Sequence, residues 1–199
     1  MVNYRTSRIL PIILVIVIIV IAIAAIVSLA RIVFFSGSST SVVVDESRAA
    51  LLTTTAGRSV NMTVRGPIVA DEEFHSYRID ISPGNRTIKT YTGYLENVVA
   101  SNSLPNSVAA YEQFVYALDK ANFSKGIELE GDRNDVRGVC ATGRVYEFSI
   151  MNNEDIVKKL WTSTCKGSVG SLKSSVTQLT SLFVNQIPDA DKLIKKVSL

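Results

Sequence analysis

The first thirty residues constrain this chain most, because a long stretch of them carries no charged side chain. The stretch is 22 residues long, beginning at Ile9 and ending at Ala30. An α-helix rises about 1.5 Å per residue, so a helix of this length spans about 33 Å, slightly more than the roughly 30 Å hydrocarbon core of a bilayer. The sequence therefore predicts a membrane-spanning helix over residues 9–30.

The charges that flank this stretch predict its orientation. Arg5 and Arg8 precede it, whereas Arg31 follows it and is compensated in charge by the later Asp45 and Glu46. Positively charged residues near the ends of a span favour the cytoplasmic side. We therefore expect a single-pass protein of the cell membrane, with its N-terminus in the cytoplasm and its C-terminal part outside.

A cleaved signal peptide is the alternative, with Ser28 and Ala30 as the small residues of a cleavage site. The apolar region of such a peptide usually has about 7–15 residues, so the longer stretch favours a retained signal anchor. A flexible tether should follow, because every residue from 36 to 41 is Ser, Gly or Thr. Four parts are expected: a cytoplasmic tail (1–8), the anchor (9–33), the tether (34–41) and one extracytoplasmic domain (42–199).

The charge distribution argues against binding to nucleic acid. All 18 acidic residues and 19 of the 21 basic residues follow the apolar stretch, leaving that part with a net charge of only +1. Nucleic-acid binders gather basic residues on one face, whereas here both signs are interspersed. The one basic cluster, formed by Lys192, Lys195 and Lys196, fits the solvated face of a short amphipathic helix.

Alternating apolar residues predict antiparallel hairpins in the outer domain. Val60, Met62 and Val64 alternate before Gly66 and Pro67 end the strand. Ser-Pro-Gly-Asn at 82–85 is a strong turn signal. It lies between a second predicted strand over 74–81 and a third over 87–94, which together form a hairpin.

Helical spacing predicts two further elements, so that the expected class is an α+β domain of antiparallel hairpins packed with two or three helices. One helix follows Pro105, capped by Asn106 or Ser107. Its apolar stripe is formed by Val108, Tyr111, Phe114, Val115 and Leu118. The other helix runs over 171–185, with Leu172, Val176, Leu179 and Phe183 on one face. A short helical stretch over 45–52, capped by Asp45, precedes the first strand.

The two cysteines predict a disulfide between Cys140 and Cys165. Strand-like runs over 145–150 and 156–161 lie between them, and a two-residue turn at Asn152 and Asn153 would place the cysteines opposite each other. The same register pairs Glu147 with Lys158, Val145 with Leu160, Phe148 with Val157 and Arg144 with Trp161. Cysteine pairs outside the cytoplasm usually oxidise, so compartment and register agree.

A cysteine enzyme is the competing hypothesis. The run Leu-Trp-Thr-Ser-Thr-Cys that ends at Cys165 resembles the strand that carries the catalytic cysteine of sortases, which are single domains behind an N-terminal signal anchor. This resemblance implies a transpeptidase in which Cys165 is the nucleophile. Sortases also need a histidine and a later arginine, but the single histidine here is His75 and no arginine follows Cys165. The overall build also resembles pilin-like surface subunits, although a leader ending in Gly and an early Glu are missing from residues 1–31.

Other chemical motifs are weak. The S-x-x-K of Ser163 and Lys166 lacks the K-T-G that accompanies it in penicillin-binding enzymes. The acidic run around Asp132 and Asp135 lacks the ligand spacing of an EF-hand. We therefore expect no catalytic, metal or cofactor residues, and a non-enzymatic envelope protein whose outer domain binds a protein partner.

Overall fold

A computed structural model describes residues 46–197 and residue 199. Within them the fold is α+β, with six strands and four α-helices. The α-helices are α2 (Glu46–Leu52), α3 (Val108–Lys120), α4 (Val176–Val184) and α5 (Ala190–Lys195). The strands are β1 (Arg58–Arg65), β2 (His75–Ile81), β3 (Asn85–Thr92), β4 (Asn97–Pro105), β5 (Val145–Asn152) and β6 (Asp155–Ser163). Two short 3₁₀-helices, η1 (Asp71–Glu73) and η2 (Gly131–Asn134), lie in the connections.

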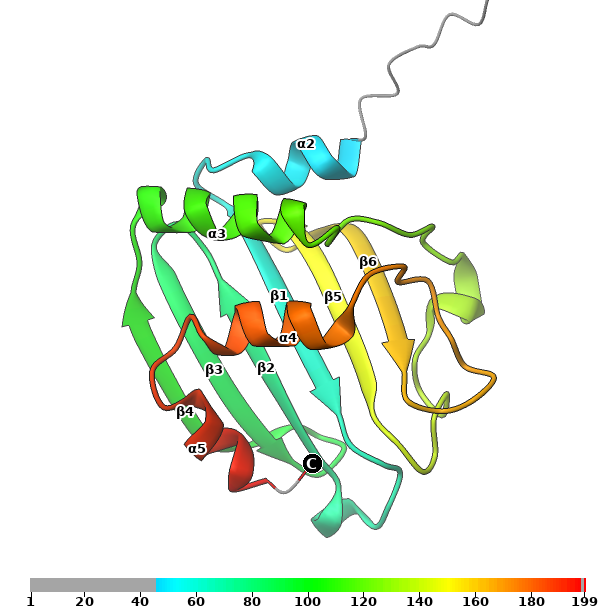
Figure 1. The fold of residues 1–199 in the computed structure, drawn as a ribbon. Helices are drawn as coiled ribbons and strands as arrows, with labels where there is room; N and C mark the ends of the chain where they lie inside the picture. The colour runs from blue at the N-terminus through cyan, green and yellow to red at the C-terminus, as the bar shows by residue number, and fades with distance from the viewer. Residues whose placement is uncertain (1–45, 198) are drawn as a thin grey trace, which may run out of the picture. The chain divides into compact units, whose positions relative to one another are not determined.

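The strands form a single antiparallel sheet in the order β4-β3-β2-β1-β5-β6 (Figure 1). Strands β1 to β4 form a meander in which each strand pairs with the next. After α3 and a long connection, β5 returns to pair with the free edge of β1, and β6 pairs with β5. The sheet therefore has two edge strands, β4 and β6.

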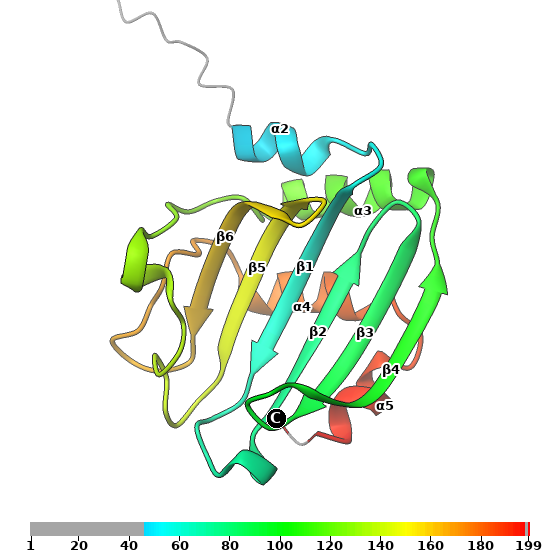
Figure 2. The ribbon, with the colours of Figure 1, turned by 180° about the vertical axis from the view of Figure 1, so that it is seen from behind.

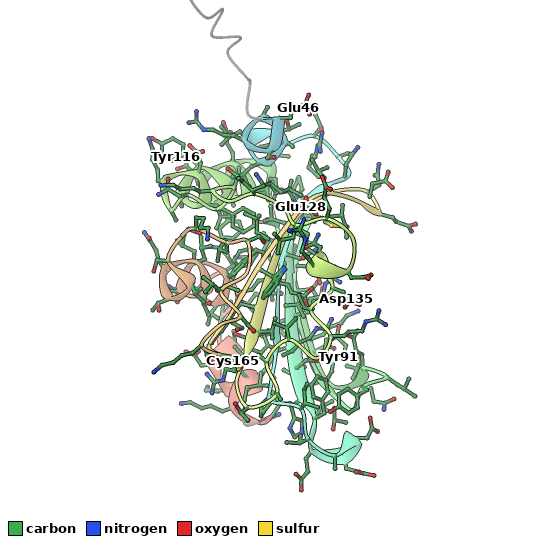
Figure 3. All side chains as sticks on the ribbon, turned by 90° about the vertical axis from the view of Figure 1, so that its right-hand side faces the viewer. Glu46, Tyr91, Tyr116, Glu128, Asp135 and Cys165 are labelled. Atoms are coloured by element: carbon green, nitrogen blue, oxygen red, sulfur yellow. A yellow bond between two sulfur atoms is a disulfide. The ribbon has the colours of Figure 1, made fainter. Side chains whose placement is uncertain are left out.

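The helices cover one face of this sheet. In β1, Val60, Met62 and Val64 are buried, whereas Thr63 and Arg65 between and after them are partly exposed. Seen edge-on, α3 and α4 lie on one side, with Tyr116 of α3 labelled there, and the segment that carries Asp135 lies on the other (Figure 3). The alternation of apolar and polar residues thus follows the covered and uncovered faces. Figure 2 shows the other face, which the α-helices leave uncovered.

The core between helices and sheet is centred on aromatic side chains. Phe114 of α3 meets Phe183 of α4 edge-to-face, with ring centroids 5.3 Å apart. Phe123, just after α3, meets Phe148 of β5 in the same way at 5.8 Å. All four rings are buried, so they join both long helices to the sheet.

The structure confirms the α+β class and most of the expected hairpins and helices, although the described residues contain four α-helices instead of the two or three expected. β1 ends before Gly66, and β2 and β3 form a hairpin around residues 82–85. Ser107 caps α3, because its side chain accepts a hydrogen bond from the Ala110 N–H. Val108 was expected in the core but lies half exposed at the first position of α3.

Helix α4 begins later than expected. Ser175 is its N-cap and accepts from the Gln178 N–H, so the helix starts at Val176 rather than near residue 171. Leu172 is buried as predicted, but it lies before the helix and forms an isolated antiparallel bridge with Gly126.

The parts expected at the N-terminus, namely the tail 1–8, the anchor 9–33 and the tether 34–41, lie outside the described residues, as does the proposed cap Asp45. Among residues 46–197 and 199, no helix is both long and apolar enough to cross a bilayer.

Candidate functional site

The predicted disulfide is present, with the Cα atoms of Cys140 and Cys165 5.6 Å apart. The register from which it was predicted is wrong. Glu147 pairs with Trp161 and Val145 with Ser163, so β6 is shifted by three residues against β5 from the expected pairing with Lys158 and Leu160. The remaining expected pairs, Phe148 with Val157 and Arg144 with Trp161, fail for the same reason.

Two local features cause the shift. The turn lies at Asn153 and Glu154 instead of 152 and 153, because Asn152 pairs with Asp155 and Asn153 adopts a positive φ of 54°. A bulge between Ile150 and Met151 adds an extra residue on β6. Sequence alone could not place the bulge, since two consecutive asparagines fit a turn in more than one position.

The cysteines meet beyond the ends of the strands. The Thr164 N–H donates to the Arg144 carbonyl at 3.0 Å, which extends the hairpin by one pair and would set Gly143 opposite Cys165. Cys140 reaches back over Gly143, where a side chain would not fit: a Cβ there would lie 2.9 Å from the Cys140 Sγ. The loop before β5 therefore doubles back on itself, and a glycine provides the space.

The bond removes the thiol on which the sortase-like hypothesis depends. Both cysteines of the chain belong to it, and neither is free. A disulfide sulfur is not a thiolate, so Cys165 in this state is no nucleophile. His75 lies at the start of β2, where its carbonyl accepts from the Gly66 N–H.

The acidic loop makes local bonds. Glu128 accepts a hydrogen bond from the Asn134 side chain, and Asp135 pairs with Arg137, whose guanidinium lowers the pKa of that carboxyl to about 2. Within the described part of the chain, no three His, Cys, Asp or Glu side chains gather closely enough to hold a metal ion.

Around the disulfide lies a small second core on the face opposite the helices. It consists of Val136, Cys140, Val145 and Trp161, with Leu129, Val139 and Cys165 packed against it. Val145 and Trp161 belong to the sheet, whereas the others belong to loops. The connection 124–144 therefore folds over one end of the uncovered face and encloses these sheet residues.

Next to this second core is an apolar groove with a volume of about 280 Å³. One wall comes from residues 136–140 and the other from the β1–β2 connection and the β3–β4 turn. The apolar side chains along it are Ile68, Phe74, Tyr94, Val136, Val139 and Val145. We call this site the apolar groove.

An aromatic pair stiffens the second wall. The rings of Phe74 and Tyr94 stack with centroids 4.2 Å apart. The Tyr94 hydroxyl donates to the Val69 carbonyl at 2.6 Å, and its backbone N–H donates to the Asp71 carboxylate at 2.7 Å. Because the ring is held at both ends, this wall of the groove is fixed by contacts within the domain.

Arg65 supplies a positive group to the apolar groove. Its Nε donates to Glu147 at 2.9 Å and its Nη1 to Glu96 at 3.2 Å, while Glu147 also lies 3.8 Å from the Lys159 ammonium. These bonds neutralise and orient the guanidinium, so the walls remain mainly apolar.

Exposed residues of two kinds line the groove or lie within three positions of a residue that lines it. Ile68 is 45% exposed and Leu95, at the tip of the β3–β4 turn, is 86% exposed. Asp71, Glu72 and Glu73 are also exposed and form no ion pair with any described residue. An apolar hollow beside unpaired carboxylates is suited to an apolar side chain flanked by basic ones.

No motif in the sequence pointed to this groove, because its residues come from four separate segments. The Phe74 and Tyr94 pair could have been suspected only from their places at the ends of the predicted strands 74–81 and 87–94. No protein family model matches this sequence, and no curated protein sequence matches it either.

Proposed function

We propose that this chain is a single-pass, membrane-anchored envelope protein whose disulfide-linked outer domain binds another protein and has no enzymatic activity. The apolar stretch from Ile9 to Ala30 would anchor it, with the N-terminus in the cytoplasm and the domain outside. The Cys140–Cys165 bond supports the outer location, because such bonds persist mainly in oxidising compartments.

The apolar groove carries the protein-binding part of this proposal. Monomeric proteins rarely leave rigid apolar surface open to water unless it binds something. Here Tyr94, whose ring stacks on the buried Phe74, is 47% exposed, and Ile68 in the same groove is 45% exposed. The carboxylates of η1 favour a partner segment in which Lys or Arg flanks an apolar residue.

Binding at the groove is testable by site-specific photo-crosslinking in intact cells that produce the full chain. A photoreactive amino acid replaces Ile68 in one variant and Ile156 in the control, which lies on the edge strand β6, does not line the groove and is similarly exposed. We expect a discrete cross-linked protein from position 68 and none from 156. The product should disappear when Glu72 and Glu73 are both changed to Lys.

Equal labelling at both positions, or none at position 68, would reject the groove as a binding site. The membrane part is tested separately by carbonate extraction of membranes and by labelling Lys residues with an impermeant reagent. Release of the full chain by carbonate, or labelling only after lysis, would contradict the anchor or its orientation without affecting the groove.

A further inference from the structure

The outer edge of β4 has the features of a strand that pairs with another strand. β4 contains no charged residue along its nine positions, and Val98 and Val99 are about half exposed. Proteins usually protect edge strands with charges, prolines or a covering loop, because the unpaired backbone groups of an edge recruit other strands. In β4, Pro105 stands only at the last position.

The opposite edge of the same sheet is protected. The N–H groups of Ser171 and Leu172 donate to the Trp161 carbonyl at 2.9 and 3.0 Å, so a loop covers the end of β6. The start of β6 carries Asp155 and two lysines at 158 and 159. The contrast indicates that β4 is left open while β6 is not (Figures 1 and 2).

The hydrogen-bond pattern identifies which backbone groups of β4 are free. The Asn106 N–H donates to the Gly84 carbonyl at 3.0 Å, just beyond the β3–β4 ladder. Because bonded positions alternate in an antiparallel pair, Ala100, Asn102 and Leu104 bond to β3, and the N–H and C=O of Ser101 and Ser103 point away from it. Outside the ladder, no hydrogen bond among the described residues reaches those four groups.

The sequence around these groups is nearly symmetric about Asn102. Residues 100–104 read Ala-Ser-Asn-Ser-Leu, with a serine on each side of Asn102 and an apolar residue beyond each serine. In an antiparallel pair with a two-fold axis at Asn102, Ser101 of one copy faces Ser103 of the other, which makes four backbone hydrogen bonds. Ala100 then faces Leu104 on the same side of the sheet.

We propose that two copies of this chain associate by antiparallel pairing of β4 with β4, about a two-fold axis at Asn102, which joins their sheets edge to edge. The absence of charge means that the strand meets no like-charge repulsion from itself. Two-fold pairing of one surface with itself is also the commonest form of protein self-association.

A cysteine at position 102 tests both the pairing and its register. Asn102 would face its own copy at a non-hydrogen-bonded position, where Cα atoms are close enough for a disulfide. Both native cysteines are already bonded, so an introduced thiol is the single free one. The experiment uses the full chain in detergent, with Asn102→Cys compared with Ile156→Cys on the protected edge under mild oxidation.

We expect Asn102→Cys to become mostly a covalent dimer, with peptide mapping showing a 102–102 bond and an intact native disulfide, while Ile156→Cys stays largely monomeric. Ser101→Pro in the Asn102→Cys background removes a free N–H that does not bond to β3 and should abolish the dimer. Ser101→Lys is a second variant that keeps the N–H and adds a repelling charge. A monomer at all concentrations, equal cross-linking of both cysteine variants, or dimers unaffected by both Ser101 changes would overturn the proposal.

Discussion

Loss of the disulfide should destabilise the domain by an amount that follows from its loop length. The bonded cysteines are 25 residues apart in sequence. In the chain-entropy model a loop of this size restricts the unfolded state by about 3.5 kcal/mol at 25 °C. For a domain of roughly 150 residues, each kcal/mol lowers the melting temperature by about 2–4 °C, so the expected decrease is about 7–14 °C.

The perturbation is best made twice, by reduction of the native protein and by the double change Cys140→Ala and Cys165→Ala. Cys140 is 2% exposed, so alanine is preferred to serine, which would bury a hydroxyl among the apolar residues of the second core. Urea unfolding followed by circular dichroism gives the free energy of unfolding. The reductant should have no effect on the double variant, which controls for its other actions.

Trp161 provides an independent measurement at the site. It is the single tryptophan of the chain, 5% exposed and packed in the second core with Val136 and Val145. If the disulfide holds the loop over the sheet, reduction should shift its fluorescence to longer wavelength before global unfolding. A loss of less than about 1 kcal/mol with unchanged fluorescence would refute the reasoning, because the loop would then be held by packing alone.

Two further substitutions test contacts that position the loops and helices. Gly143→Ala should destabilise the domain by about 1–3 kcal/mol, because the new Cβ would lie 2.3 Å from the Thr164 Oγ1; Gly84→Ala, with nothing within 4 Å, is the matched control in urea unfolding. The hydrogen bonds from Arg48, at 2.7 and 2.9 Å, lower the pKa of Asp119 below 3.8. Their contribution to the free energy of unfolding is therefore present above pH 3.8 and is lost as the pH falls through the folded pKa. Asp119→Asn should therefore lower the free energy of unfolding at pH 7 by less than about 1 kcal/mol, a small value because the arginine is more than half exposed. It should also flatten the decrease of stability at acid pH, and an unchanged decrease would contradict this assignment.

Local signals in the sequence predicted the elements in which one face is buried. The alternation in β1 and the spacing of Tyr111, Phe114 and Leu118 in α3 repeat at the period of their own element, so they are visible without knowledge of the fold. β4 was missed for the converse reason. Its residues are mostly small, polar and exposed, so the strand is defined by pairing with β3 and not by a pattern of its own.

The disulfide shows how a correct contact can be predicted from an incorrect register. Two cysteines with a hairpin between them, in a chain expected to enter an oxidising compartment, constrain the pair strongly, whatever the exact turn. The register depended on where the chain reverses, which involves the bulge beside Met151 and the positive φ of Asn153, whose N–H donates to the Gly57 carbonyl at 2.6 Å. The apolar groove lay beyond prediction altogether, since it requires the β1–β2 connection, the β3–β4 turn and the connection before β5 to meet at one end of the sheet.

The second core explains why the disulfide and the apolar groove occur together. In the second core only two buried residues of the connection 124–144, Val136 and Cys140, pack against Val145 and Trp161 of the sheet, a small cluster compared with the main core between helices and sheet. Val136, Cys140 and Val145 belong both to this cluster and to the groove. Without the covalent bond, the entropy of ordering so long a connection would compete with little apolar burial. The bond therefore acts mainly on the groove wall, and the sheet and its helices should keep their packing when it is reduced.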